Sequence, residues 1–95
     1  MSIVLYIPSP LRAFSKERGQ VKIDTTPPTV GEALESLWLV CPGLRERIIT
    51  EQGEIRRHIN VFVGDESIRY TGGLSTPLSG DVEISILPAV SGGTG

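Results

Sequence analysis

The stretch that decides the fold is residues 27–43, PPTVGEALESLWLVCPG. Its Thr29 stands three residues before Glu32, so the hydroxyl and the carboxylate can each bind a free backbone N–H of a first helical turn. Apolar residues then recur at helical spacing until Pro42-Gly43 interrupts the pattern. These apolar residues are Val30, Leu34, Leu37 and Cys41. We therefore predict one amphipathic helix between Thr29 and Pro42, with Cys41 on its packed side.

Both flanks of this helix alternate apolar and polar residues, a pattern typical of half-buried strands. The expected strands cover residues 3–7, 20–24, 58–63, 67–70 and 82–87. Their inward rows are Ile3, Leu5 and Ile7, then Val21 and Ile23, then Ile59, Val61 and Val63, and finally Val82, Ile84 and Ile86. The order along the chain is therefore a hairpin, the helix, two strands and a last strand.

One helix on one face of a mixed sheet buries these rows economically, so the pattern predicts an α+β domain. With the last strand beside the first, it becomes a ubiquitin-like β-grasp, a mixed sheet of four or five strands with one main helix on one face. We expect residues 1–90 to form this domain. Residues 91–95, SGGTG, carry three glycines and no apolar side chain, which predicts a flexible C-terminal tail containing Gly92-Gly93.

Composition excludes several classes of function. The chain has 95 residues, a formal charge of −2, one cysteine and one histidine, which argues against a disulfide framework, a zinc site or a cysteine-ligated iron–sulfur cluster. Nucleic-acid binding is not expected, because the five aromatic residues and the single basic cluster, Arg56-Arg57-His58, make no basic stripe. We interpret that cluster, His58 included, as a solvated strand entrance. No apolar run reaches the ~20 residues that span a bilayer, and no secretory signal opens the chain, so we expect a cytoplasmic location and no membrane partner.

Three segments of the distal half carry a resemblance to a known family. They are NVFV at 60–63 with Asp65, RYTGGL at 69–74 and ILPAVSGG at 86–93. The chain resembles the ThiS/MoaD family of ubiquitin-like sulfur carrier proteins, most closely the carriers of a cysteine-biosynthesis pathway. The internal Gly72-Gly73 is not the family's terminal pair, and we interpret it as a tight bend.

The resemblance implies a protein that is a co-substrate and not an enzyme. In such carriers a ubiquitin-activating-type adenylyltransferase uses ATP to activate the carboxylate of the terminal glycine, and a sulfur donor then displaces AMP to leave a thiocarboxylate. The carrier itself binds no cofactor. Glycine suits this end of the chain because a backbone without side chains can thread a narrow channel. The resemblance therefore implies that the functional residues are Gly92 and Gly93.

Thr94-Gly95 departs from the family pattern, because it leaves the Gly93 carbonyl in a peptide bond. A metalloprotease of the JAMM type, which the family uses in some members, could cleave between Gly93 and Thr94. Alternatively, Gly95 itself is activated, or the last two residues are a cloning remnant. We expect trimming.

The tail needs a folded docking surface beside it. Ordering about six flexible residues costs roughly 6–12 kcal/mol, whereas a micromolar complex has only about 8 kcal/mol in total. Phe62 and Leu87 face outward from the third and last strands, and we expect them to be neighbours that dock the partner together with Tyr6. Arg69 is a candidate contact for an acidic group of the partner or for a surface ion pair. Scattered surface apolar residues are the alternative reading of the same pattern.

The expected function is sulfur delivery for cysteine biosynthesis, with a sulfur-transfer enzyme such as a cysteine synthase downstream. Carriers for thiamine, molybdopterin or siderophore synthesis would need the same tail. A ubiquitin-like protein modifier shares the activation step and differs only in its acceptor. A noncatalytic β-grasp interaction module, in which the tail is incidental, is the remaining alternative.

Overall fold

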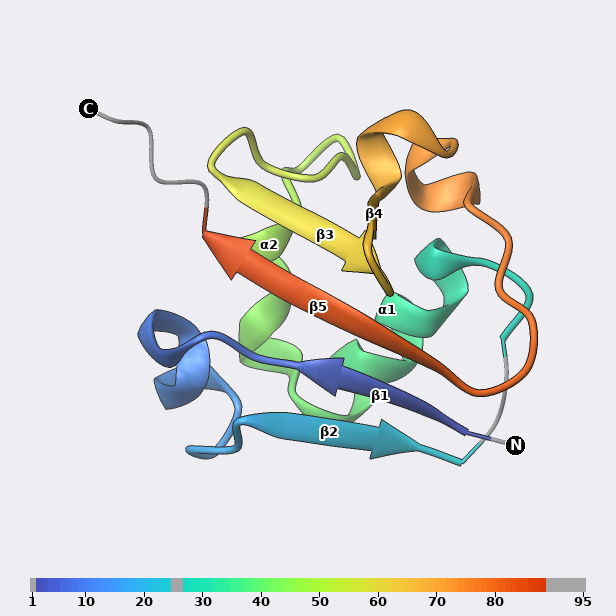
Figure 1. The fold of residues 1–95 in the computed structure, drawn as a ribbon. Coiled ribbons are helices and arrows are strands. Elements are labelled where there is room, and N and C mark those ends of the chain that lie inside the picture. Colours follow the sequence, from blue (N-terminus) through green and yellow to red (C-terminus); the bar gives the residue numbers. More distant parts are fainter. Residues whose placement is uncertain (1, 25–26, 89–95) are drawn as a thin grey trace.

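The computed structural model describes residues 2–24 and 27–88, which fold around one mixed sheet. The strands are β1 (Ile3–Tyr6), β2 (Gln20–Ile23), β3 (Ile59–Val63), β4 (Glu66–Ser67) and β5 (Val82–Pro88). They lie in the order β2-β1-β5-β3-β4 (Figure 1). The last strand is central: β5 runs parallel to β1 and antiparallel to β3. This is the predicted β-grasp, with five strands.

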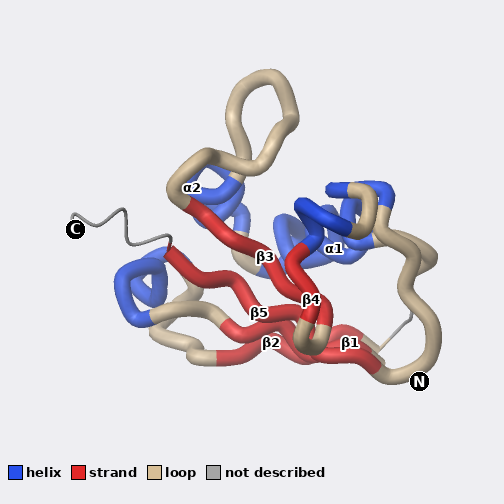
Figure 2. The backbone as a smooth tube through the Cα atoms, turned by 45° about the horizontal axis from the view of Figure 1, so that its top comes forward, coloured by secondary structure: helices blue, strands red, loops and turns tan. Residues whose placement is uncertain are grey.

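Two α-helices and several 3-10 turns complete the described fold. Helix α1 covers Val30–Val40 and helix α2 covers Arg45–Ile48, and Figure 2 shows both on the same side of the sheet. We call the side of the sheet toward α1 the inner face and the opposite side the outer face. Most inner-face residues are buried, and the largest fully buried side chains include Leu5, Ile59, Val61, Ile84 and Ile86. Val63 and Val82, also predicted to face inward, are partly buried and pack against this core. No helix in the described ranges is long and apolar enough to cross a membrane.

Helix α1 begins at the predicted cap, although half of the predicted capping arrangement is different. The Thr29 hydroxyl accepts the backbone N–H of Glu32 at 3.3 Å, as expected. The Glu32 carboxylate, however, accepts a hydrogen bond from the Thr29 hydroxyl at 3.4 Å and not from a backbone N–H. The residues that flank Thr29 pair with another segment: Val30 N–H donates to the carbonyl of Thr76 at 3.0 Å, and Thr29 forms a β-bridge with Pro77. At its other end, α1 is capped by Cys41, which is buried as predicted.

The prediction of a strand over residues 67–70 is wrong for most of that range. Only Glu66–Ser67 pairs with β3, and a 3-10 turn, Ile68–Tyr70, follows immediately. The cause is local, because the Ser67 hydroxyl accepts the backbone N–H of Arg69 at 3.3 Å and so bends the chain away from the ladder. Gly72 and Gly73 then turn the chain with φ angles of 118° and 61°, which confirms the predicted bend.

Candidate functional site

The predicted chemical site, Gly92-Gly93, and the predicted cleavage point before Thr94 lie outside the described residues. The structure does describe the place from which the chain leaves the sheet. Strand β5 ends at Pro88, whose partner across the sheet is Ile59, the first residue of β3 (Figure 1). Gly93 follows Pro88 by only five residues. The chain therefore continues toward Gly93 from this end of the central strand.

The register places the predicted docking residues on one face. Tyr6 of β1 lies beside Ser85 of β5, and Ser85 in turn lies beside Phe62 of β3. Leu87 lies beside Asn60, so Phe62 and Leu87 are diagonal neighbours and not a directly opposed pair. Side chains on such diagonals of an antiparallel pair, with Cβ atoms about 7–8 Å apart or less, are within reach of one another when one of them is aromatic.

The outer face combines an apolar centre with polar surroundings. Leu87 is 45% exposed, while Val4, Tyr6 and Phe62 are half-buried. Exposed polar residues, Gln20, Lys22 and Glu83, lie on β2 and β5 around this centre. An apolar centre with a polar rim is the usual composition of a protein-binding surface. The outer face is therefore suited to binding a protein partner.

Tyr6 is held on the outer face by a polar contact. Its hydroxyl donates a hydrogen bond to the Glu83 carboxylate of the neighbouring strand at 3.3 Å. The negative charge of Glu83 raises the pKa of Tyr6 above its ordinary value of 10.0, and desolvation and the hydrogen bond raise it further. Tyr6 is therefore a neutral phenol at physiological pH, oriented along the surface of the sheet.

Arg69 makes contacts within the domain. Its guanidinium donates to the backbone carbonyl of Arg57 at 3.1 Å and to that of Ile59 at 3.4 Å. These bonds join the turn after β4 to the start of β3. The expected contact of Arg69 with an acidic group of a partner stays a prediction, and the structure gives this residue an internal positioning role.

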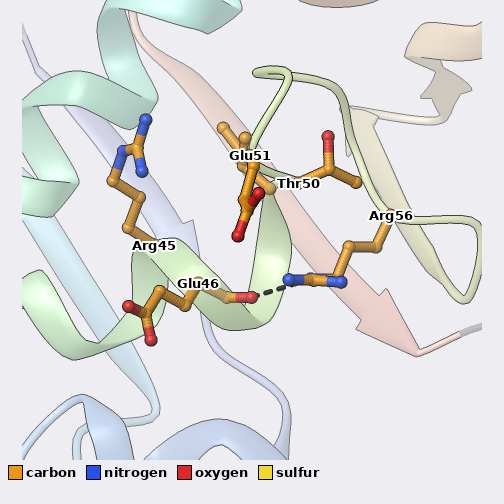
Figure 3. Close-up of a pocket in the computed structure, with 6 residues that line it drawn as sticks. Arg45, Glu46, Thr50, Glu51 and Arg56 are labelled. Carbon is orange, nitrogen blue, oxygen red and sulfur yellow. Dashed lines mark hydrogen bonds between the residues drawn. The ribbon is translucent and has the colours of Figure 1, made fainter.

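A hollow that the sequence did not indicate lies between α2 and the loop that precedes β3. Its volume is about 290 Å³, and it is lined by Arg45, Glu46, Ile49, Thr50, Glu51 and Arg56. Figure 3 shows the Arg56 side chain reaching the backbone of Glu46, where its Nε donates to the carbonyl at 2.7 Å. The lining contains no cysteine, serine or histidine that could serve as a nucleophile or general base. In the parts of the chain that the structure describes, no group of three or more potential metal ligands is present.

Comparisons with known proteins agree with this geometry. The model of the ThiS family matches residues 5–93, a range that includes both tail glycines. Sulfur carrier protein CysO of Mycobacterium tuberculosis is 33% identical over 95 residues, covering 98% of this chain and 100% of that protein. Small archaeal modifier protein 3 of Haloferax volcanii is 37% identical over 65 residues, covering 68% of this chain and 70% of that protein. Among solved structures, a chain of the Amycolatopsis orientalis BexX/CysO complex superposes with a TM-score of 0.84 at 31% identity, covering 95% of this chain and 98% of that chain.

Proposed function

Because this chain belongs to the ThiS family, we propose that it is a sulfur carrier protein whose working group is the carboxylate of Gly93, exposed after removal of Thr94-Gly95. The observation that carries this proposal is the family match itself, which covers residues 5–93 and so ends at Gly93. The likeness to CysO over 98% of the chain supports the same role. We place this function in the cytoplasm.

The proposed chemistry needs a partner enzyme at every step, because a free carboxylate is a poor electrophile. An ATP-using adenylyltransferase joins a Gly93 carboxylate oxygen to the α-phosphorus of ATP, and pyrophosphate leaves. Sulfide then attacks the acyl carbon and AMP leaves, so that the product is a thiocarboxylate and no oxidation or reduction occurs. The carrier contributes position and recognition, while its partners supply the nucleophile, the acid–base groups and the metal-bound nucleotide.

The dimensions of the chain determine how the carrier presents this group. Gly93 is the fifth residue after Pro88, and an extended chain of five residues spans about 17 Å. A narrow channel in the partner can therefore enclose the tail while the partner surface around its entrance rests on the outer face. Tyr6, Phe62 and Leu87 would supply binding energy that a tail of small residues lacks.

For the acceptor we propose cysteine biosynthesis, supported by the likeness to CysO. In this scheme the thiocarboxylate sulfur displaces the leaving group of an activated serine derivative on a cysteine synthase. An acyl shift then moves the Gly93 acyl group to the amino nitrogen, and a JAMM-type protease hydrolyses the resulting amide to release cysteine. The solved BexX/CysO complex supports the idea that a carrier of this kind binds another protein.

A second candidate is a ubiquitin-like protein modifier, which is favoured by the likeness to Small archaeal modifier protein 3. In that case the activated Gly93 carbonyl is attacked by a lysine amine of a target protein in place of sulfide. The described fold serves both candidates equally, because the docking surface and the activation step are shared. Only the acceptor separates them.

Intact-mass spectrometry tests the proposal directly. The full chain is incubated with an extract of its own cells, ATP and a sulfide source. We expect loss of the last two residues, followed by replacement of one oxygen by sulfur. A chain ending at Gly93 is the positive control, and a chain lacking Gly92 and Gly93 is the negative control. Covalent adducts on other proteins without sulfur replacement would favour the modifier, and an unreactive Gly93-ending chain would overturn both candidates.

A further inference from the structure

The basic cluster Arg56-Arg57-His58 lies next to the strand end from which the tail begins. It immediately precedes Ile59, and Ile59 is the strand partner of Pro88, the last described residue before the tail. Arg47 of α2 joins the cluster, since Arg47, Arg56 and His58 line one open hollow of about 280 Å³ together with Glu46. We call Arg47, Arg56, Arg57 and His58 the basic collar. The collar therefore lies at the start of β3, the end of that strand which pairs with Pro88.

Two of the collar arginines are held in place by uncharged groups. The guanidinium carbon of Arg47 lies 4.2 Å from the centre of the Phe14 ring. Arg56 donates through Nε to the backbone carbonyl of Glu46 at 2.7 Å. These partners fix the side chains without neutralising their charge. Binding of a ligand here therefore costs less conformational entropy of the arginine side chains. The carboxylates that line the two hollows are those of Glu46 and Glu51, and the arginines are Arg45, Arg47 and Arg56, so the lining carries a formal surplus of one positive charge.

The opposite end of the sheet is acidic. Asp65 follows β3 and Asp81 precedes β5, at the ends of these strands that are farthest from the tail. The seven residues of β5 separate the two ends by about 20 Å, which exceeds the ~8–10 Å over which salt screens surface charges. The collar therefore presents a local positive field on a chain whose formal charge is −2.

The length of the tail determines which group can interact with the positive charge of the collar. With the tail extended, the Gly93 carboxylate is about 17 Å from Pro88, beyond contact with the collar and largely screened from it. A partner that draws the tail into a channel, by contrast, brings the rim of that channel to Pro88 and hence to the collar. Charge complementarity then calls for carboxylates on that rim.

We propose that the basic collar docks against acidic residues around the entrance of the adenylyltransferase channel and orients the carrier as it approaches. This inference rests on the proposed function and adds a second contact, independent of the apolar outer face. The adenylyltransferase is the occupant we choose, because it must bind a carrier that is negative overall and whose tail ends in a free carboxylate. A positive collar at the root of that tail turns the correct end of the carrier toward an acidic entrance.

The test compares two charge reversals of equal size. Arg57→Glu alters the collar at an exposed residue, and Asp65→Lys reverses a charge of the same size at an exposed residue after β3, at the end of the sheet farthest from the tail. Both are made in a chain ending at Gly93, which removes no described residue, and the rate of sulfur incorporation is measured at low carrier concentration with cell extract, ATP and sulfide. At low salt we expect Arg57→Glu to slow the reaction about tenfold, and Asp65→Lys to change it less than about twofold.

Salt dependence and a milder variant complete the test. The loss caused by Arg57→Glu should shrink as sodium chloride is added, and Arg57→Gln should lose less than Arg57→Glu, while thermal unfolding stays unchanged for all three variants. Equal rates for Arg57→Glu and Asp65→Lys at low salt, or a loss that salt does not reduce, would overturn the proposed docking role of the collar and would not affect the proposed sulfur-carrier function. If the unaltered Gly93-ending chain gains no sulfur, both the proposed function and the proposed docking role of the collar are wrong.

Discussion

The two faces of the sheet are built from the same strands and differ completely in exposure. On the inner face, Leu5, Val61, Ile84 and Ile86 are at most 1% exposed. Their immediate neighbours on the outer face, Val4, Tyr6 and Phe62, are half-buried, and Leu87 is 45% exposed. Because side chains alternate between the faces with a period of two residues, stability and partner binding are assigned to alternate positions of one strand. Substitutions at adjacent residues should therefore have separate consequences.

The largest expected effect is on the inner face. Ile84→Ala removes a fully buried side chain from the centre of β5 and leaves a cavity between the sheet and the inner-side elements, so it should lower the free energy of unfolding by about 2–5 kcal/mol. Urea unfolding followed by circular dichroism measures this change. Ser85→Ala, one residue further along the same strand, is the matched control and should change stability by no more than about 0.5 kcal/mol. Similar losses for both variants would abolish the distinction between the faces.

On the outer face the expected effect concerns activity. The double variant Phe62→Thr, Leu87→Thr introduces β-branched residues, which are suited to strands, and removes two apolar side chains from the apolar centre. We expect sulfur incorporation to slow about tenfold or more, as for the loss of central apolar contacts in an interface, with at most about 1 kcal/mol lost per side chain in stability. The same mass-spectrometric rate assay and urea unfolding provide both readings. A normal rate would remove these residues from the docking surface.

A smaller effect is expected at the helix that covers the inner face. Thr29→Ala removes the acceptor of the Glu32 backbone N–H and should lower the free energy of unfolding by about 1 kcal/mol. Thr29→Ser retains the hydroxyl and should recover most of that loss. Because α1 lies on the inner side, sulfur incorporation at a temperature where the variant is folded should not change. A slowed reaction under those conditions would extend the docking surface to α1.

The sequence predicted the elements of the fold better than their pairing. Alternation and helical spacing identify the faces of β1, β2, β3, β5 and α1, because burial imposes those periods directly. They contain no information on which strands are neighbours, so the expected place of the last strand beside the first depended on the family resemblance. The register of β3 against β5, which makes Phe62 and Leu87 diagonal, likewise depends on turn geometry and packing beyond the strands themselves.

The site was predictable where it depends on residue type and not where it depends on backbone acceptors. Gly92-Gly93 stands out in the sequence, although it lies outside the described residues. Arg69 and Arg56, by contrast, donate to carbonyls that are ten or twelve residues away in the chain. Every residue has a carbonyl, so no sequence pattern marks such an acceptor, and Arg56-Arg57-His58 gains its significance only from lying beside Pro88.

The smallest expected effect lies at the edge of the apolar centre, where Tyr6 meets Glu83. Glu83→Gln removes the negative charge that is the main cause of the raised pKa, so the pKa of Tyr6 should fall toward its ordinary value of 10.0. Absorbance titration of tyrosinate measures it, in a Tyr70→Phe background so that Tyr6 is the one tyrosine left. An unchanged pKa would mean that Glu83 does not act on Tyr6 in solution.

The sign of the linked stability change follows from the direction of the pKa shift. A tyrosine whose pKa is higher in the folded state binds its proton more tightly there, so its contribution is fully present below the unfolded-state pKa near 10 and is lost as the pH rises through the folded-state value. The midpoint temperature of thermal unfolding should therefore fall less steeply above pH 10 in Glu83→Gln than in the unaltered chain. Because Tyr6 is on the outer face, this difference should be small beside that of Ile84→Ala. A large one would show that the outer face contributes to the stability of the fold as the inner face does.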